Sequence, residues 1–545
     1  MRAAPVLVLV LICLLLGCAC SGNLQAPATT RPMPASGGSL TEAVVGPIGT
    51  LNPVAATTPN AQDVDALVYQ GLTTIDGEQR PVPQLAKSWS VSSNGLVYTV
   101  QLREGIRWAD GAPFTASDVL FTYRSLQNRT AAAAMAPTWR DTTVVQIGQH
   151  EVRFTLKAPS ASFPLALRQP IIPAHVFSTI SEEAMASDPH SNALAFGTGP
   201  FRVASISKDR RTVTLRRNAD ATPRPYLDSF AFHAYATLAD GLAAVGSGSA
   251  DSLGALQPPD LAPLRQSQNV VVRETGSFTD LGLYFGLTDQ NAPVLGSLPV
   301  RRAFERAIDR EAIIQQVLGS HATEALGPIP PASWAYAPRA AAGAGGGYDP
   351  GAAKAALDAA GWKVDPATGL RTMQGRPLTL TLLVTSVYPQ LQIATAIVGQ
   401  LRKIGIDVQV DAVPTATLVS RLVANQYQLA LVAIDSGADP DEYATWHSDP
   451  APGTLNFASS YLPRQALMDK DLEDGRAAPT RAARAPIYRD FQSLVAQSVP
   501  AVFLCSERYD YVTSRRVGGI QLAPAVDPAD RLQGVAGWYV NTKSS

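Results

Sequence analysis

The stretch Pro83–Leu126 constrains the fold more than any other part of the sequence. Apolar and polar residues alternate over Val97–Arg103, which predicts a strand with one buried face. A tight turn at Asp110–Gly111 follows, and Thr115 precedes Asp118 by three residues, the spacing of a helix-capping pair. Apolar residues at helical spacing then predict a helix. The stretch therefore specifies a strand, a turn and a helix in close succession.

This stretch contains L-A-x-S-W from Leu85 and N-G-x-x-Y-T-V-x-L-R-x-G-I-x-W-x-D-G-x-P-F-T-A-x-D-V from Asn94. Both runs resemble the signature of the bacterial extracellular solute-binding proteins of family 5, which serve peptide and nickel ABC importers. A second match, V-R-x-A-x-x-x-A-I-D-R from Val300, lies far from the first. The resemblance implies an α/β fold with two lobes, of periplasmic-binding-protein type II and its large peptide-binding class, with an additional subdomain in the first lobe.

The length of the chain requires more than one hydrophobic core, because 545 residues exceed what one core usually organises. The resemblance implies that residues 39–278 form lobe 1, with the inserted subdomain at about residues 60–195. Lobe 2 then comprises residues 279–498, and residues 499–545 return to lobe 1. We therefore expect two strands to cross between the lobes, one at Thr279–Leu287 and one in the returning segment.

The N-terminus has the pattern of an exported protein. Arg2 is followed by an apolar run over Val6–Leu16, which is shorter than the roughly 20 residues that span a membrane. A short apolar run after a basic residue is typical of a signal peptide, so we expect one at residues 1–17.

The end of this run also predicts a lipid anchor. Leu15–Cys18 resembles a bacterial lipobox, which implies that Cys18 is lipidated, with Cys20 as the weaker alternative. Residues 18–38 are rich in Ala, Pro, Thr and Gly and should form a flexible tether. We therefore expect a lipoprotein on the outer face of the cytoplasmic membrane, in the periplasm or cell envelope.

Composition and motifs argue against several functional classes. The formal net charge of -1 offers no basic surface for nucleic acid. The histidines show neither i,i+4 nor H-x-H spacing, so we expect no metal site and no cofactor, although His447 leaves capture of a metal chelate open. The sequence has no G-x-S-x-G elbow and no phosphate-binding loop, so we do not expect an enzyme. Cys505 follows an apolar run and should be buried and inert.

The expected ligand site lies at the end of a predicted strand in the second lobe. Relatives hold a peptide as an added strand, and the resemblance implies that Val432, Ala433 and Ile434 form the edge that the peptide joins. Relatives also place an aspartate in the following loop, where it pairs with the α-ammonium group of the peptide.

Two alignments of that loop stay open. Three residues separate Asp435 from Asp439, whereas relatives commonly have two. Alignment from Asp439 puts Ser436 at the position of the aspartate, and a one-residue insertion restores Asp435. All three residues are therefore candidate ligand contacts. The alternative is an Asx-turn loop in which the aspartates cap their own backbone.

A further candidate contact lies in the first lobe. The sequences around Leu51–Pro53 and Tyr69–Leu72 resemble family elements that flank a loop facing the ligand. By that resemblance Thr58, Pro59 and Asn60 are ligand contacts. The alternative is an ordinary surface loop.

These features together predict a monomeric substrate-binding lipoprotein of an ABC importer. It would capture short peptides in the cleft between its lobes and deliver them to the permease and ATPase subunits. One alternative keeps the fold but changes the ligand to a metal chelate, haem, a sugar or a cell-wall fragment. The other is a surface protein that signals or adheres without transport.

Overall fold

The computed structural model describes residues 33–56, 58–128, 139, 141–254, 256–342, 347–451 and 453–543. The predicted signal peptide, the anchor at Cys18 and most of the tether lie outside the described residues. Within them, no helix is both long enough and apolar enough to cross a membrane.

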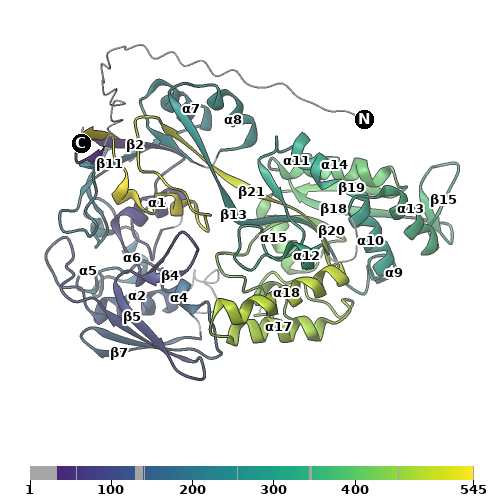
Figure 1. The fold of residues 1–545 in the computed structure, drawn as a ribbon, viewed down its shortest axis with the longest axis horizontal. Coiled ribbons are helices and arrows are strands. Elements are labelled where there is room, and N and C mark those ends of the chain that lie inside the picture. The colour runs from purple at the N-terminus through teal and green to yellow at the C-terminus, as the bar shows by residue number, and fades with distance from the viewer. Residues whose placement is uncertain are drawn as a thin grey trace, which may run out of the picture.

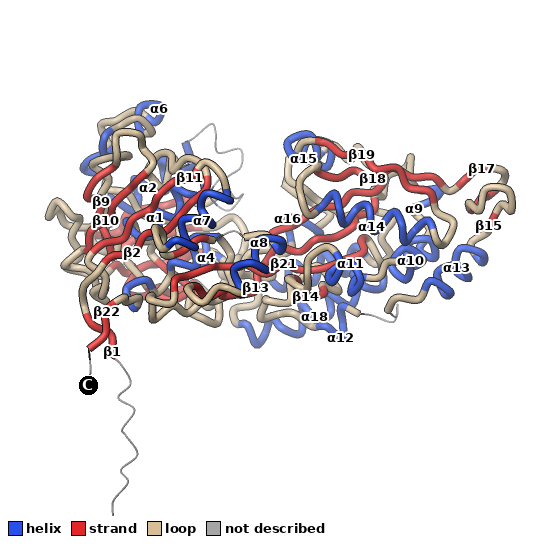
Figure 2. The backbone as a smooth tube through the Cα atoms, turned by 90° about the horizontal axis from the view of Figure 1, so that it is seen from above, coloured by secondary structure: helices blue, strands red, loops and turns tan. Residues whose placement is uncertain are grey.

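Two long strands connect the two lobes of the molecule (Figures 1 and 2). They are β13 (Val270–Phe285) and β21 (Ala501–Ser514), which pair antiparallel along most of their length. The ladder changes register between Gly276 and Asp280, where β13 leaves the first lobe. The crossing strand begins at Val270, before the Thr279 predicted from the sequence.

These strands join the sheets of both lobes into one sheet of eleven strands, in the order β19-β18-β20-β13-β21-β12-β2-β11-β10-β9, with β14 paired to β21. The lobe 1 strands are β2 (Ser39–Val45), β9 (Phe201–Ile206), β10 (Thr212–Arg217), β11 (Ser229–Tyr235) and β12 (Ser252–Leu253). The lobe 2 strands are β14 (Ala322–Glu324), β18 (Thr379–Thr385), β19 (Asp407–Val413) and β20 (Leu429–Asp435).

The sheet of lobe 1 is covered on both faces because its strands alternate their side chains. Leu40 and Val44 of β2 pack with α1 (Pro59–Val68), whereas Ala43 packs with α7 (Leu238–Ser247) and α8 (Pro258–Arg265) on the other face. The smaller elements of lobe 1 are β1 (Met33–Ala35), paired with β22 (Asn541–Lys543), β3 (Thr73–Ile75), paired with β4 (Pro81–Pro83), η3 (Pro528–Leu532) and η4 (Val535–Gly537).

A separate antiparallel sheet lies in the stretch where the sequence predicts an inserted subdomain. It has the order β5-β6-β8-β7 and lies beside α2 (Ala116–Asn128). The capping pair predicted from the sequence is present, since Asp118 Oδ2 accepts from Thr115 N at 2.8 Å. The elements here are β5 (Ala86–Val91), β6 (Val97–Leu102), β7 (Thr143–Gly148), β8 (Glu151–Thr155), α4 (Phe163–Ala166), α5 (Ala174–Phe177), α6 (Glu182–Met185) and η2 (Pro189–Ser191).

Helices cover both faces of the lobe 2 sheet. Leu283 and Phe285 of β13 face the core that α10, α11, α13 and α14 complete, whereas Tyr284 faces the core of α15, α17 and α18. The helices are α9 (Ala292–Leu295), α10 (Leu298–Ala307), α11 (Arg310–Gln316), α12 (Pro338–Ala341), α13 (Pro350–Ala359), α14 (Gln390–Arg402), α15 (Thr415–Val423), α16 (Tyr443–Trp446), α17 (Gln465–Ala477) and α18 (Arg481–Ser498). A small sheet adds β15 (Lys363–Val364), β16 (Arg371–Met373) and β17 (Arg376–Pro377).

The lobes also touch away from the crossing strands, where the inserted subdomain meets α17 and α18 (Figure 1). Arg481 Nη1 donates to the carbonyl oxygen of Glu78 at 2.7 Å, and the backbone N–H of Ala161 donates to Arg476 O at 2.9 Å. Gln79 Nε2 donates to Ala332 O at 2.9 Å. Lobe 1 and lobe 2 are therefore held together both by the crossing strands and by this second contact.

Candidate functional site

The strand β20 has an open edge in the half that leads to the predicted ligand loop. On one side the strand pairs with β13, with Asp435 opposite Thr279. On the other side β18 pairs only with Leu429 and Ala430. Residues 431–435 therefore have a strand partner on one side only among the described residues. An unpaired row of backbone N–H and C=O groups is the feature that accepts an added strand.

The side chains along this edge differ in their surroundings. Val432 is 5% exposed and belongs to the lobe 2 core, whereas Ala433 is exposed and Ile434 is half-buried. The three predicted residues therefore lie together on the open half of β20, and Ala433 offers the least side-chain bulk beside it.

Asp435 ends the strand and faces the other lobe. Its carboxylate Oδ1 accepts from the backbone N–H of Gly437 at 2.9 Å, which makes an Asx turn. Burial among protein atoms raises the pKa of Asp435, although the residue is solvent-exposed.

Asp527 belongs to the C-terminal segment of lobe 1 and interacts electrostatically with Asp435. Burial raises the pKa of Asp527, the negative charges of Asp530 and Asp435 raise it further, and the positive charge of Arg168 lowers it. Asp435 and Asp527 therefore lie close enough across the lobes to repel each other. A cation placed between them would relieve that repulsion.

Asp439 is used differently, although it lies in the same loop. Arg484 binds it with two hydrogen bonds, one of them from Nη1 to Oδ2 at 2.7 Å, and the guanidinium group also lies over the Trp334 ring at 5.4 Å. This bidentate pair braces the loop against α18. Both oxygens of Asp439 are thus already occupied within lobe 2.

Ser436 and the nearby Glu442 connect the loop to the crossing strand. The backbone N–H of Ser436 donates to Phe278 O at 3.0 Å. Burial raises the pKa of Glu442 to about 7, while hydrogen bonds with Ser436 and Thr445 act in the opposite direction. The Ser436 side chain is therefore directed at Glu442, which sequence reasoning did not select.

The predicted contacts in lobe 1 hold their own loop. Thr58 is the N-cap of α1: its hydroxyl accepts from Ala61 N at 3.2 Å and donates to Ile48 O at 2.7 Å. Asn60 Nδ2 donates to three backbone oxygens, among them Val45 O at 2.9 Å. Pro59 is the first residue of the helix. The polar groups of Thr58 and Asn60 are thus engaged in local structure.

A pocket of about 640 Å³ lies in lobe 1, between the end of α1, residues 165–170 and residues 527–536. Asp65 lines it and is 3% exposed, and neither of its carboxylate oxygens has a hydrogen-bond partner among the described residues. Burial raises the pKa of Asp65 well above its ordinary value. Asp527 also lines the pocket. The sequence signal for Asp65 was available, since it lies four residues after Ala61 and three before Val68, the spacing of one apolar helix face.

Two side chains that the sequence singled out are structural in the described part of the chain. His447 is 6% exposed, stacks on Tyr443 and has a partner at each ring nitrogen, with Nε2 3.2 Å from Glu473 Oε1 and Nδ1 3.0 Å from Asp449 N. Cys505 is fully buried, and burial raises the pKa of its thiol.

Comparison with known proteins identifies the family. The model of the bacterial extracellular solute-binding proteins, family 5 (middle), matches residues 80–454. The chain belongs to this family. As a family 5 protein, it is the substrate-binding component of an ABC importer, and it acts in the cell envelope. Members of the family are transport components, not enzymes.

The relatives of this family 5 protein match nearly its whole length. It is 26% identical over 537 residues to the oligopeptide-binding protein AppA of Bacillus subtilis (strain 168), covering 96% of each chain. The structure of Bacillus subtilis AppA in complex with a nonapeptide has a TM-score of 0.70 at 22% identity, covering 93% of this chain and 100% of that chain. NikZ from Campylobacter jejuni in complex with Ni(L-His) has a TM-score of 0.71 at 24% identity, with 92% and 99% covered. The predicted family and two-lobed fold are thereby confirmed.

Proposed function

We propose that the protein captures short peptides between its lobes and delivers them to the permease and ATPase subunits of an ABC importer. The observation that carries this proposal is the open edge of β20, which ends at Asp435. An extended peptide that joins the edge gains main-chain hydrogen bonds whatever its side chains are.

Asp435 would set the direction in which a peptide binds. Its carboxylate lies near the negatively charged Asp527 and accepts a hydrogen bond from Gly437 N, so its negative charge is poorly compensated. The α-ammonium group of a peptide would form a charge-assisted hydrogen bond there and lower the pKa of Asp435. The peptide would then enter with its N-terminus at Asp435, and binding would release a proton in the range where the free carboxyl is protonated.

The lobe 1 pocket supports a preference for cationic side chains. Asp65 and Asp527 both line it, and Asp65 has no compensating partner among the described residues. A buried carboxylate ionises readily only with a cation beside it. A lysine or arginine side chain of the ligand would supply that cation.

Transport would follow from closure of the two lobes on the ligand and anchoring at Cys18. A ligand that touches both lobes favours the closed state over the open one by its additional contacts. The lipid on Cys18 would keep the protein on the outer face of the membrane as a monomer beside the permease. A Cys18→Ala variant should therefore move from the membrane fraction to the soluble fraction of the envelope.

The test combines native mass spectrometry with thermal melts. Mass spectrometry of protein purified without denaturation should show co-purified short peptides, and added peptides should raise Tm, because a ligand at about 100 times its Kd stabilises by about 2.7 kcal/mol. A non-peptide mass as the co-purified ligand, together with no shift across a diverse peptide library, would refute the proposal.

The matched variants are Asp435→Asn and Asp228→Asn. Asp435→Asn should weaken binding of free peptides by about tenfold or more, the value of one charge-assisted hydrogen bond. N-acetylated peptides, which lack the ammonium group, should bind both proteins alike. Asp228 is an exposed partner of Arg217, so Asp228→Asn should leave affinity unchanged. An equal loss in both variants would exclude Asp435 as the ammonium partner.

A further inference from the structure

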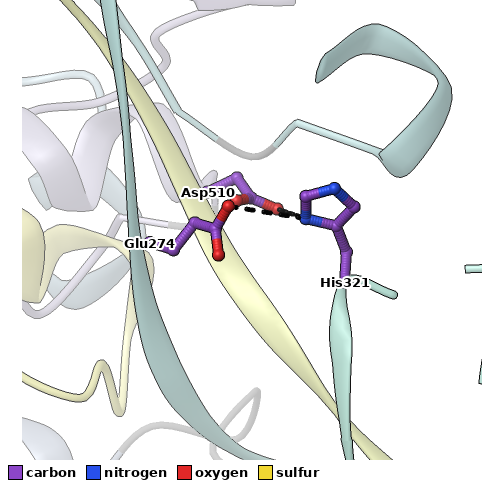
Figure 3. Close-up of side chains that lie close together, drawn as sticks. All are labelled: Glu274, His321 and Asp510. Carbon is purple, nitrogen blue, oxygen red and sulfur yellow. Dashed lines mark ion pairs between the residues drawn. The ribbon is translucent and has the colours of Figure 1, made fainter. Parts of the chain in front are cut away.

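Three side chains from distant parts of the chain converge beside the crossing strands (Figure 3). Glu274 of β13 and Asp510 of β21 are cross-strand partners, and His321 comes from the loop before β14. His321 Nδ1 lies 3.7 Å from Glu274 Oε1 and 3.8 Å from Asp510 Oδ2. One donor atom from each residue lies within 4.8 Å of the others.

These separations suit one shared ion better than direct hydrogen bonds. A distance of 3.7 or 3.8 Å is too long for a hydrogen bond. Two donors that each bind a zinc ion at about 2.0–2.2 Å lie at most about 4.4 Å apart. Both distances from His321 fall inside that limit. Tetrahedral coordination brings donors to about 3.4 Å from each other, so the third pair, whose atoms lie within 4.8 Å, would contract when the ion binds.

The second observation is an unsatisfied buried group. Asp510 is 2% exposed, yet its Oδ1 has no hydrogen-bond partner in the described part of the chain. His321 Nδ1 likewise lacks a hydrogen-bond partner there. The Asp510 oxygen near His321 Nδ1 is the other one, Oδ2, at 3.8 Å. A carboxylate with an unsatisfied buried oxygen beside an imidazole nitrogen without a partner is costly unless something binds both groups.

We propose that Glu274, His321 and Asp510 form a binding site for a divalent transition-metal ion, of which Zn²⁺ is the best match. One imidazole and two carboxylates are ligands that Zn²⁺ accepts, and a water molecule would complete four-fold coordination. The imidazole disfavours Ca²⁺ and Mg²⁺, which take oxygen ligands. The site is separate from the peptide site proposed above and does not depend on it.

Two arginines compete with the ion for Glu274. Arg265 contacts its Oε1, and Arg508 Nη1 donates to its Oε2 at 3.0 Å. Both arginine side chains are partly exposed, at 47% and 41%. Exposed ion pairs contribute about 0–1 kcal/mol, so Arg265 can move into solvent at little cost when the ion arrives. The neighbouring positive charges should weaken the site, and removing one should strengthen it.

The ion would link lobe 2 to the crossing strands. His321 belongs to lobe 2, and its carbonyl oxygen accepts from Arg508 N on β21 at 3.2 Å. Glu274 and Asp510 lie on the part of the ladder before the register change. Coordination would therefore tie the β14 loop to both strands and limit bending at the crossing.

The test is calorimetric titration of untagged, EDTA-treated protein with zinc chloride. The wild-type protein should bind one ion saturably. His321→Gln and Asp510→Asn should each lower the affinity by at least about tenfold, the loss that even an outer-shell partner of a metal ligand brings. Arg265→Gln should raise it severalfold. Magnesium chloride should not compete.

His175→Gln is the matched control, because His175 Nε2 lies 2.8 Å from Asp110 in an exposed pair outside this cluster. It should leave zinc affinity unchanged. Circular dichroism and melts in EDTA establish that each variant is folded. Zinc should slow amide exchange in β13 and β21 of the wild type and of His175→Gln, but not of His321→Gln or Asp510→Asn. Absence of saturable zinc binding, equal binding by His321→Gln, or weaker binding by Arg265→Gln would overturn the proposal.

Discussion

Asp435 and Asp439 lie in the same loop but have opposite surroundings. Arg484 binds both oxygens of Asp439, so that this carboxylate braces lobe 2. Among the described residues, Asp435 accepts a hydrogen bond only from its own turn, and it interacts electrostatically with Asp527 of the other lobe. Position in the sequence therefore does not distinguish an acid that braces the loop from one without a cation partner. The presence of a cation partner within the same lobe distinguishes the two kinds of acid.

The same contrast holds within lobe 1. Arg531 binds Glu42 and Asp63, and all three side chains are almost completely buried. Asp65, only two residues from Asp63, has no such partner among the described residues. Paired acids thus stabilise the interior of each lobe. In the pocket, Asp530 is paired with Arg168, whereas Asp65 has no such partner in the described part of the chain.

The largest expected effect concerns the buried acids that are paired with an arginine. Arg531→Met would leave two carboxylates buried without a cation, so the free energy of unfolding should fall by about 3–5 kcal/mol. Urea denaturation measures the loss. The control is Arg217→Met, which removes an ion pair with the exposed Asp228 and should cost no more than about 1 kcal/mol. Equal losses would remove the distinction between buried and exposed pairs.

Glu442 tests what an unpaired buried acid costs. Its folded pKa is about 7 and its ordinary value is 4.5. Because the folded pKa is the higher one, Glu442 favours folding below pH 4.5, and this contribution is lost as the pH rises through 7. The loss amounts to at most about 3 kcal/mol. Glu442→Gln should flatten this part of the stability profile, as urea midpoints at pH 5 and pH 8 would show. If stability depended on pH in the same way in Glu442→Gln as in the wild type, the role given to Glu442 would be wrong.

The two loop aspartates give the direct comparison. Asp439→Asn should lower the free energy of unfolding by about 2 kcal/mol, because the buried Arg484 loses its charged partner. Asp435→Asn should leave that free energy unchanged or raise it, since it removes a poorly compensated charge. Paired urea denaturation curves measure both. A larger loss of unfolding free energy for Asp435→Asn than for Asp439→Asn would show that Asp435, not Asp439, braces the loop.

The smallest expected effect concerns the predicted contacts of lobe 1. Thr58→Ala removes an N-cap and should cost about 1 kcal/mol of stability while leaving peptide affinity unchanged. Thr58→Ser, which keeps the hydroxyl, is the control. A loss of affinity without a loss of stability would instead make Thr58 the ligand contact that the family resemblance implies.

Local patterns predicted the elements but missed the start of the crossing strand. The strand at β6 and the helix α2 follow from alternation and capping that neighbouring residues specify. The first half of β13 was missed because Gly276 and Ser277 interrupt its apolar pattern just before the register change. A strand that bends between two lobes does not keep one buried face, so alternation fails there.

The sequence by itself determined the family, the two-lobed α/β fold and the position of an acidic loop after a strand, because these depend on neighbouring residues. Only the tertiary structure decided which of these acids has a cation partner. Arg484 lies far along the chain from Asp439, and Asp510 still farther from Glu274 and His321. A carboxylate acquires its role from the charges and burial around it, and packing supplies both.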